Sequence, residues 1–258
     1  MTAASEPESV MSKGVVLITG ASSGLGEEMA RQFAALSYDL ALCARRTDRL
    51  ETLAEDIRSR TGRRVETAAL DVTDDEDVPV VFHRFADEFG GIDRVVVNAG
   101  IGKGTPLGTG RADANRATAM TNFVGALAQI EAALEIFRRQ GRGHLVLISS
   151  MSALRGMRKS MTTYAATKAG VAALAEGLRS ENIPGLDVSV IYPGYIRSEM
   201  NERVQQKTRF MVDTETGVRS MVEAIERRRA KAYVPAWPWV PIGLAMKVLP
   251  LQIVRRLT

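Results

Sequence analysis

The stretch Val15-Val-Leu-Ile-Thr-Gly20-Ala-Ser-Ser-Gly-Leu-Gly26 decides the fold of this chain. Its apolar, β-branched beginning predicts a buried strand, and the periodicity from residue 25 to 36 predicts a helix directly after a glycine-rich turn. Glycines let backbone N–H groups approach a pyrophosphate, and the amino end of the helix favours its negative charge. The predicted phosphate-binding residues are Gly20, Ser22, Ser23, Gly24, Leu25 and Gly26.

Strand and helix patterns alternate along the rest of the chain. Strands are predicted at 15–19, 39–43, 65–70, 93–97, 144–148 and 187–191, with a short seventh at 232–234. Helices are predicted at 25–36, 47–60, 74–89, 113–140, 163–181 and 214–230. Strands that are apolar on both faces indicate an α/β fold, a doubly wound, Rossmann-like parallel sheet with helices on both faces. We expect a disordered tail at 1–12 and one catalytic domain at 13–235.

Composition excludes several other classes of protein. With 45% apolar and 25% charged residues, the 258-residue chain has the balance of a folded globular protein. The net charge of +4 is spread along the chain, so we expect no nucleic-acid partner. Cys43 is the single cysteine, and the first dozen residues lack a secretory pattern, so we expect a cytoplasmic protein. His83 and His144 lack metal-ligand spacing, and no metal is predicted.

The end of the second strand carries two cations, Arg45 and Arg46. An NAD-binding fold is expected to place an acidic residue there for the ribose 2′-hydroxyl. A carboxylate would repel a 2′-phosphate, whereas a guanidinium binds it with two hydrogen bonds. The sequence therefore favours NADP(H) over NAD(H). The alternative is that both arginines lie in a solvated loop.

Polar and small residues also follow the third and fourth strands. Asp71, next to Val72, is predicted to accept a hydrogen bond from the adenine amino group, or, with Thr73, to cap the next helix. Asn98, Ala99 and Gly100 let the backbone pass close to the cofactor, and Asn98 is expected to tie neighbouring strands together.

The fifth strand leads to the residues that we expect to carry the chemistry. It ends in Ser149-Ser150, and the helix that follows places Tyr164 and Lys168 on one face because they are four residues apart. A nearby ammonium is expected to lower the pKa of the phenol, and Ser150 is expected to donate a hydrogen bond to the substrate oxygen. Asn122 is expected to hold a water that relays protons.

Taken together, these motifs resemble the short-chain dehydrogenase/reductase family, over residues 13 to 235. The resemblance implies a seven-stranded sheet, an Asn122–Ser150–Tyr164–Lys168 tetrad and a nicotinamide cofactor. It also implies that Lys168 contacts the nicotinamide ribose. Homodimers or homotetramers built on the helices at 113–140 and 163–181 are implied too. After the sixth strand come four further cofactor residues implied by the resemblance, namely Pro193, Gly194, Ile196 and Ser198.

Two positions depart from the family pattern. Ser198 stands where the family often has Thr. The family often places its catalytic Ser thirteen positions before the Tyr, which here is Met151. We choose Ser150, because it ends the strand, and keep Ser152 as the alternative.

The substrate end of the sequence leaves alternatives open. Tyr195, Met200, Phe210 and Met211 either line an apolar pocket or pack as ordinary helix residues. Residues 236–258 form an apolar, Pro- and Trp-rich extension whose prolines disfavour a continuous membrane helix. This extension packs on the core or a partner subunit, closes over an apolar substrate, or touches a lipid surface as a peripheral contact.

The sequence therefore predicts an NADP(H)-dependent oxidoreductase that interconverts a small-molecule carbonyl and alcohol. We expect a reductase of an apolar or lipid-like ketone or aldehyde. The alternative is a catalytically silent NADP-binding regulatory protein on the same fold, and a lyase or epimerase also stays open. All four tetrad residues are present, which favours the enzyme.

Overall fold

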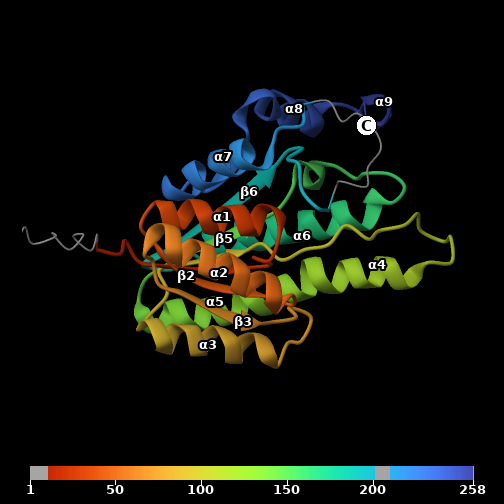
Figure 1. Cartoon of the computed structure of the whole chain (residues 1–258). Coiled ribbons are helices and arrows are strands. Elements are labelled where there is room, and N and C mark those ends of the chain that lie inside the picture. Colours follow the sequence, from red (N-terminus) through yellow and green to blue (C-terminus); the bar gives the residue numbers. More distant parts are fainter. Residues whose placement is uncertain (1–10, 201–209, 258) are drawn as a thin grey trace, which may run out of the picture.

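The computed structural model describes residues 11–200 and 210–257, and over these ranges it confirms the predicted α/β class and doubly wound sheet (Figure 1). The parallel strands are arranged in the order β3-β2-β1-β4-β5-β6-β7. They are β1 (Val15–Thr19), β2 (Asp39–Ala44), β3 (Val65–Ala69), β4 (Arg94–Val97), β5 (Gly143–Ile148), β6 (Leu186–Pro193) and β7 (Lys231–Val234). Most of the expected tail, residues 1–10, lies outside the described residues.

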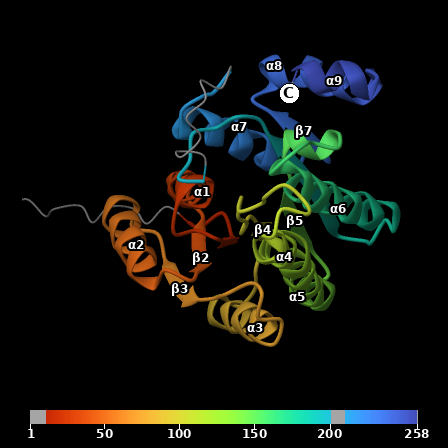
Figure 2. The ribbon, with the colours of Figure 1, turned by 90° about the vertical axis from the view of Figure 1, so that its right-hand side faces the viewer.

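Helices cover both faces of this sheet and create two separate cores (Figure 2). On one face pack α1 (Gly24–Ala35), α2 (Thr47–Thr61) and α7 (Thr214–Glu226). On the other face pack α3 (Asp77–Phe89), α5 (Gly125–Gln140) and α6 (Met161–Ser180). Side chains of successive strand residues alternate between the two cores, so Ile18 belongs to the first and Leu17 to the second. Strands buried on both faces explain the continuous apolar runs in the sequence.

The predicted helix at 113–140 is divided in the structure. It consists of α4 (Ala112–Ala119), a π-helical turn η1 (Met120–Val124) and α5. The wider turn shifts the helical register, so that Asn122 is buried within it. Such turns are frequent at functional sites, and periodicity alone does not reveal them.

Two other helix boundaries differ from the prediction. The helix predicted from residue 74 begins at Asp77, because a turn intervenes in which the Asp74 carboxylate accepts a hydrogen bond from the Asp77 N–H. The helix predicted to end at residue 230 ends at Glu226. The segment that follows it turns back into β7.

A buried polar network ties the amino ends of the central strands to α7. Arg94 is paired with Glu226 at 2.6 Å, and its Nε donates to Nδ1 of His144 at 3.0 Å. The proton of the neutral imidazole therefore lies on Nε2, which is 2.8 Å from the hydroxyl of Ser189. Burial, followed by the charge of Arg94, lowers the pKa of His144 to about 3. His144 is thus a structural residue far from the carboxyl ends of the strands.

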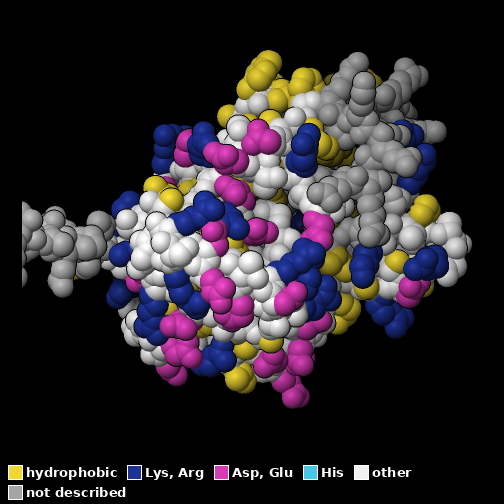
Figure 3. Space-filling model, in the orientation of Figure 1, with side chains coloured by type: hydrophobic (Ala, Val, Ile, Leu, Met, Phe, Trp, Pro, Cys, Tyr) yellow, Lys and Arg dark blue, Asp and Glu magenta, His cyan; other side chains and the backbone are white. Residues whose placement is uncertain are grey.

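The C-terminal extension forms two helices, α8 (Ala236–Val248) and α9 (Leu251–Leu257). Helix α8 packs on β7 and on the short 3-10 helix η2 (Met151–Leu154), and it buries Trp239 and Gly243. Trp237, Val240, Leu244 and Val248 of this helix are exposed, and Figure 3 shows hydrophobic side chains gathered over it. Within the described part of the chain, no helix is both long and apolar enough to cross a membrane.

Candidate active site

Most of the residues that the sequence singled out follow β1, β4, β5 and β6, which are neighbours in the sheet. Because neighbouring parallel strands end at the same edge, the glycine-rich turn, Asn98, Ser150 and Pro193 meet there. Figure 2 looks onto this edge of the sheet, at the amino end of α1. The topology thus brings together residues that lie more than 170 positions apart in the sequence.

The glycine-rich turn contains positions that no other residue fits without strain. Gly20 and Gly24 have positive φ values of 64° and 57°. A Cβ on Gly20 would lie 2.9 Å from the Cα of Ala99, and a Cβ on Gly26 would collide with the carbonyl of Gly20. The turn therefore keeps an open backbone surface at the start of α1.

Thr19 and Asn98 fasten this turn to the end of β4. The Thr19 hydroxyl accepts from the backbone N–H groups of Asn98 at 3.1 Å and Ala99 at 3.0 Å. The Asn98 amide donates to the Thr19 carbonyl at 2.9 Å. Asn98 therefore ties neighbouring strands together, as the sequence predicts.

A cluster of hydroxyl and guanidinium groups lies beside the turn. Arg46, at the beginning of α2, donates to the hydroxyls of Ser22 at 3.3 Å and Ser23 at 2.6 Å. Its two terminal nitrogens also bind the carboxylate of Glu199, at 3.1 and 3.0 Å, and Arg49 binds the same carboxylate at 3.3 Å. We call these four cationic and hydroxyl side chains, without Glu199, the anion cluster.

Sequence reasoning missed two members of this arrangement. Arg49 lies three residues after Arg46 on α2, so helical spacing could have indicated it. Glu199 has no such local signal, because the end of β6 brings it here across the sheet. Arg45 is separated from the cluster and forms an ion pair with Asp71 at 3.6 Å.

Asp71 does not cap α3, which was one of its two predicted roles. Its carboxylate accepts from the N–H and the hydroxyl of Thr73, at 3.0 and 2.8 Å, and α3 begins only at Asp77. Partial burial raises the pKa of Asp71, but the hydrogen bonds from Thr73 and the charge of Arg45 leave that pKa lowered. Val72 follows in the same turn, and its carbonyl lies against Gly125.

These residues fit a phosphate-bearing dinucleotide. The glycines leave room for backbone N–H groups to approach a pyrophosphate, at a helix amino end. The anion cluster already surrounds a carboxylate with donors from Ser23, Arg46 and Arg49. A phosphate monoester presents acceptor oxygens of the same kind and at least the same charge.

Tyr164 and Lys168 lie in the amino-terminal part of α6, and Lys168 is almost completely buried. The Lys168 ammonium donates to the carbonyl of Ile148, at the end of β5, at 2.8 Å. Burial lowers the pKa of Lys168 to about 8. Burial also raises the pKa of Tyr164, and a hydrogen bond with Ser150 lowers it only in part.

The net direction of the Tyr164 shift is therefore opposite to the one that the sequence predicted. The prediction considered the charge of Lys168 alone. In the folded chain, the loss of water around the phenol outweighs the hydrogen bond from Ser150, because a phenolate is costly to bury. The free site thus favours the protonated phenol.

Ser150 and Ser152 occupy different positions relative to this phenol. Ser150 is the residue that shares a hydrogen bond with Tyr164. Its hydroxyl oxygen also accepts from the N–H of Ser152 at 3.2 Å and from the Ser152 hydroxyl at 3.0 Å. Ser152 thus hydrogen-bonds to Ser150, and Ser150 is the serine that hydrogen-bonds to the phenol. Ser149 points elsewhere and donates to the carbonyl of Lys168 at 2.8 Å.

Asn122 lies beside the same groups but bonds to the backbone. Its amide accepts from the Ile101 N–H at 2.7 Å and donates to the Ile101 carbonyl at 2.8 Å. A Cβ on Gly100 would lie 3.2 Å from the Asn122 side-chain oxygen and 3.5 Å from the Lys168 ammonium. Gly100 therefore lets Asn122 and Lys168 approach each other.

The segment after β6 crosses the edge of the sheet. The Gly194 N–H donates to the Val234 carbonyl at 2.8 Å, and Ile196 forms a β-bridge with Val212. A Cβ on Gly24 would touch Ser198 at 3.4 Å, so Ser198 lies over the glycine-rich turn. Tyr195 stacks edge-on against Trp239, with ring centroids 5.4 Å apart. Part of the predicted substrate cover, residues 201–209, lies outside the described residues.

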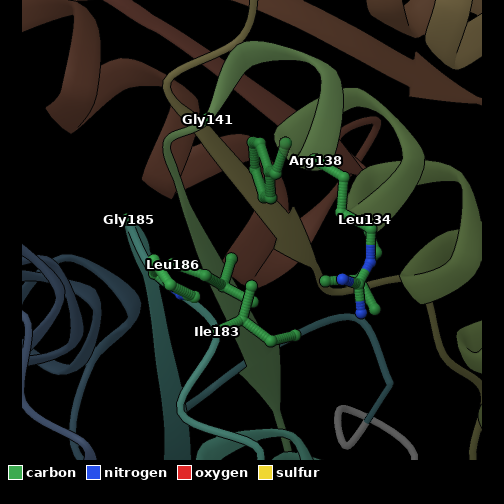
Figure 4. Close-up of a pocket in the computed structure, with 8 residues that line it drawn as sticks. Leu134, Arg138, Gly141, Ile183, Gly185 and Leu186 are labelled. Carbon is green, nitrogen blue, oxygen red and sulfur yellow. The ribbon is translucent and has the colours of Figure 1, made fainter.

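A separate hollow of about 200 Å³ lies at the opposite edge of the sheet (Figure 4). It is lined from α5 and from the loop before β6, by residues such as Leu134, Arg138, Ile183 and Leu186. Its position at the amino ends of β5 and β6 separates it from Tyr164. In the described ranges, no group of three or more His, Cys, Asp or Glu is arranged to hold a metal ion.

The family model for short chain dehydrogenases matches residues 14–209. The chain belongs to the short-chain dehydrogenase family. An uncharacterised oxidoreductase of Mycobacterium tuberculosis strain H37Rv is 54% identical over 243 residues, which cover 93% of this chain and 96% of that protein. An alcohol dehydrogenase of the archaeon Thermococcus sibiricus, complexed with 5-hydroxy-NADP, has a TM-score of 0.76 at 26% identity, covering 85% of this chain and 95% of its own.

A short-chain dehydrogenase/reductase of Burkholderia phymatum, in complex with NAD, has a TM-score of 0.81 at 21% identity and covers 95% of each chain. This similarity concerns the fold alone. Membership of the short-chain dehydrogenase family confirms the predicted family and the seven-stranded Rossmann-like fold. It also makes the chain an oxidoreductase.

Proposed function

We propose that this chain is an NADP(H)-dependent reductase of an apolar or lipid-like ketone or aldehyde. The observation that carries the proposal is the meeting of Tyr164, Ser150 and Lys168 beside the glycine-rich turn. The alternative is a catalytically silent NADP-binding regulatory protein. A binding protein would gain nothing from burying the Lys168 ammonium next to a protonated phenol, which costs free energy.

The preference for NADP(H) rests on the anion cluster. Arg46, Arg49 and the hydroxyls of Ser22 and Ser23 offer a 2′-phosphate both charge and hydrogen bonds. No carboxylate follows directly after β2 to accept the 2′-hydroxyl of NAD. Arg45 and Asp71 pair with each other outside the cluster, and we assign them to the adenine end.

We assign the remaining cofactor residues, which lie along the edge of the sheet, to two parts of the dinucleotide. Beside the pyrophosphate we place the glycine-rich turn and the backbone of Asn98, Ala99 and Gly100. At the nicotinamide end we place Pro193, Gly194, Ile196 and Ser198, with Lys168 at the ribose. Ser198 lies over Gly24, which is consistent with one cofactor joining the two groups.

In the reducing direction, Tyr164 donates its hydroxyl proton to the substrate oxygen. Ser150 donates a hydrogen bond to the same oxygen, on which negative charge develops. The bound nicotinamide supplies the hydride. The Lys168 ammonium then stabilises the phenolate left on Tyr164. We assign Asn122 to hold a water that relays a proton to Lys168, whose neighbour it is.

The substrate class follows from the side chains around this tetrad. Tyr195 and Trp239 stack together at the end of β6, and Met200 lies against Gly102. Met151 and Leu154 belong to η2, which begins directly after Ser150, and both pack against Gly243 of α8. An apolar surrounding of this kind suits a bulky apolar carbonyl compound and binds a charged one poorly.

Three further proposals concern the setting of the enzyme. We propose a homodimer or homotetramer built on η1, α5 and α6, because Met120, Val124 and Leu127 are exposed there. We propose a cytoplasmic location, which suits the buried free thiol of Cys43. We also propose that α8 and α9 make a peripheral contact with lipid, since both expose apolar side chains.

The first experiment is a pair of calorimetric titrations with NADPH and NADH, followed by a panel of apolar ketones and aldehydes monitored by nicotinamide absorbance. Tight NADPH binding with turnover of any member supports the reductase. Tight binding without turnover of any member favours the regulatory alternative. If neither cofactor binds, the proposal is wrong.

The variant Tyr164→Phe tests the assigned proton donor. We expect its turnover to fall by about 10²- to 10⁴-fold, because the phenol is the only group assigned to transfer the proton. Cofactor affinity should stay within about twofold, since the ring remains. Undiminished turnover would contradict the role assigned to Tyr164.

A further inference from the structure

Glu199 reaches across the edge of the sheet to the cofactor end of the site. It follows Ser198 in the segment after β6, about 150 positions from its partners in the sequence. Its carboxylate accepts from both terminal nitrogens of Arg46, at 3.1 and 3.0 Å, and from Arg49 at 3.3 Å. The contact therefore joins the end of β6 to the beginning of α2.

This carboxylate lies among the donors that we assign to a 2′-phosphate. Arg46 directs its Nε to Ser22 and one terminal nitrogen to Ser23, and both terminal nitrogens bind Glu199. A guanidinium has five N–H donors in a fixed plane. The part of the fork that would bind a phosphate is thus engaged by a carboxylate of the chain itself.

The charge of Glu199 persists at every pH at which the enzyme is expected to work. Hydrogen bonds from Arg46 and Ser23 lower the pKa of Glu199 to about 2. Protonation therefore does not release it at neutral pH. A phosphate that approaches Arg46 meets a fixed negative charge, and like charges this close repel each other.

We propose that Glu199 is an internal competitor for the 2′-phosphate of NADP(H) and so a determinant of cofactor preference. The proposal rests on the assignment of the anion cluster to that phosphate under the proposed function. The 2′-phosphate has to displace the carboxylate of Glu199 before it can bind the guanidinium groups of Arg46 and Arg49. NADH carries no 2′-phosphate and binds without this displacement, so Glu199 narrows the preference for NADPH.

The size of the effect follows from the exposure of the ion pairs. The side chains of Arg46 and Glu199 are 39% and 46% exposed, and those of Arg49 and Glu199 are 50% and 46% exposed. Such pairs contribute modestly because water screens them. We expect the removal of the carboxylate to raise the affinity for a 2′-phosphate by about three- to tenfold.

The test compares the wild type, Glu199→Gln and a control, Glu181→Gln. Glu181 is also an exposed carboxylate with an arginine partner, Arg138 at 3.8 Å, but it lies at the opposite end of α6. Calorimetry measures the affinity of each protein for four ligands: NADPH, NADH, adenosine 2′-monophosphate and adenosine 5′-monophosphate. The mononucleotides probe the anion cluster without the nicotinamide and without turnover.

We expect Glu199→Gln to bind NADPH and adenosine 2′-monophosphate about three- to tenfold more tightly than the wild type does. Its affinity for NADH and adenosine 5′-monophosphate should stay within about twofold. Glu181→Gln should match the wild type for all four ligands. This result excludes a general effect of the lost negative charge.

Three outcomes would overturn the inference. Glu199→Gln could leave the affinity for both phosphorylated ligands unchanged, raise all four affinities equally, or weaken NADH binding. The last result would make Glu199 an acceptor for the 2′-hydroxyl. If the wild type prefers NADPH in any of these cases, the proposed function stands and only the inference fails. If the wild type binds neither NADPH nor NADH, the proposed function itself fails.

Discussion

At the scale of single residues, burial acts in opposite directions on the two groups that we assign to proton transfer. It raises the pKa of Tyr164 and lowers that of Lys168, because water stabilises a phenolate and an ammonium better than the protein interior does. The first shift keeps the phenol protonated at neutral pH, which suits a proton donor. The second brings the titration of Lys168 close to the working range of the enzyme.

This pair of shifts predicts the pH dependence of carbonyl reduction. The pKa of Lys168 is about 8, so the ammonium is charged below that pH and neutral above it. The rate of reduction should be constant from about pH 6 to pH 7.5 and then fall, by up to about tenfold per pH unit. The measurement is kcat against pH at saturating NADPH.

Two variants at position 168 serve as controls for this prediction. Lys168→Arg keeps a cation throughout the range, so its alkaline decline should move upward or vanish. Lys168→Met should be slow at every pH. A wild-type rate that does not change up to pH 10 would show that the charge of Lys168 is not required.

At the scale of elements, α8 packs against the segment after β6 that we assign to the nicotinamide end. Its Trp239 is buried against Gly194, the second residue of the Pro-Gly pair at the end of β6, and stacks on Tyr195. The indole N–H of Trp239 has no hydrogen-bond partner among the described residues, so shape rather than polarity holds this contact. Of the three predicted roles of the C-terminal extension, packing on the core is therefore observed for part of it.

The contact between Gly194 and Trp239 predicts that a methyl group added at position 194 lowers the stability of the protein. Gly194→Ala would place a Cβ inside the indole of Trp239, so we expect a loss of about 1–3 kcal/mol of unfolding free energy in urea. Cofactor affinity should fall as well, because we assign Gly194 to the nicotinamide end. Tryptophan fluorescence should report the displaced ring.

Gly156→Ala is the matched control, because no heavy atom lies within 4 Å of a Cβ built there. In a Trp239→Leu background, the cost of Gly194→Ala should shrink, since the smaller side chain leaves space. Equal costs in both backgrounds would mean that the indole does not fill the space beside Gly194.

At the scale of the whole molecule, apolar surface and positive charge gather at the C-terminal end. Val240, Leu244 and Val248 lie four residues apart on α8 and are all exposed, whereas Trp239 and Gly243 of the same helix are buried. From residue 227 to 258 the sequence has seven Lys or Arg and no Asp or Glu. An apolar stripe with cations and no acids suits an anionic lipid surface.

This arrangement predicts binding to vesicles that contain anionic lipid. The protein should sediment with phosphatidylserine-containing vesicles more than with purely zwitterionic ones. A triple variant, Val240→Gln, Leu244→Gln and Val248→Gln, should reduce the bound fraction by about tenfold or more, since it removes the buried apolar area.

A double variant, Val80→Gln and Leu107→Gln, is the control, because it removes exposed apolar side chains outside α8. It should bind vesicles like the wild type. Equal binding by the wild type and the triple variant would contradict a lipid contact through α8. If the triple variant instead binds vesicles like the wild type but has a different oligomeric state in solution, the apolar stripe of α8 is a subunit interface.

The order of the elements and most of the site could be predicted from local sequence. Buried parallel strands need continuous apolar runs, and a tight turn over a phosphate needs glycine. Strand β1 and the turn Gly20–Gly26 can therefore be predicted from their own residues. The spacing of Tyr164 and Lys168 is set by the helix itself. Each of these features depends on neighbours within a few positions.

Contacts between distant segments could not be predicted in this way. The sign of the Tyr164 shift depends on how much water the folded chain excludes. The π-turn around Asn122 packs against α6, a contact between segments far apart in the sequence. Glu199 meets Arg46 only because β6 and β2 end at the same edge of the sheet. Sequence determined the elements and their chemistry, whereas the tertiary structure decided which charges meet, because burial and long-range proximity exist only in the folded chain.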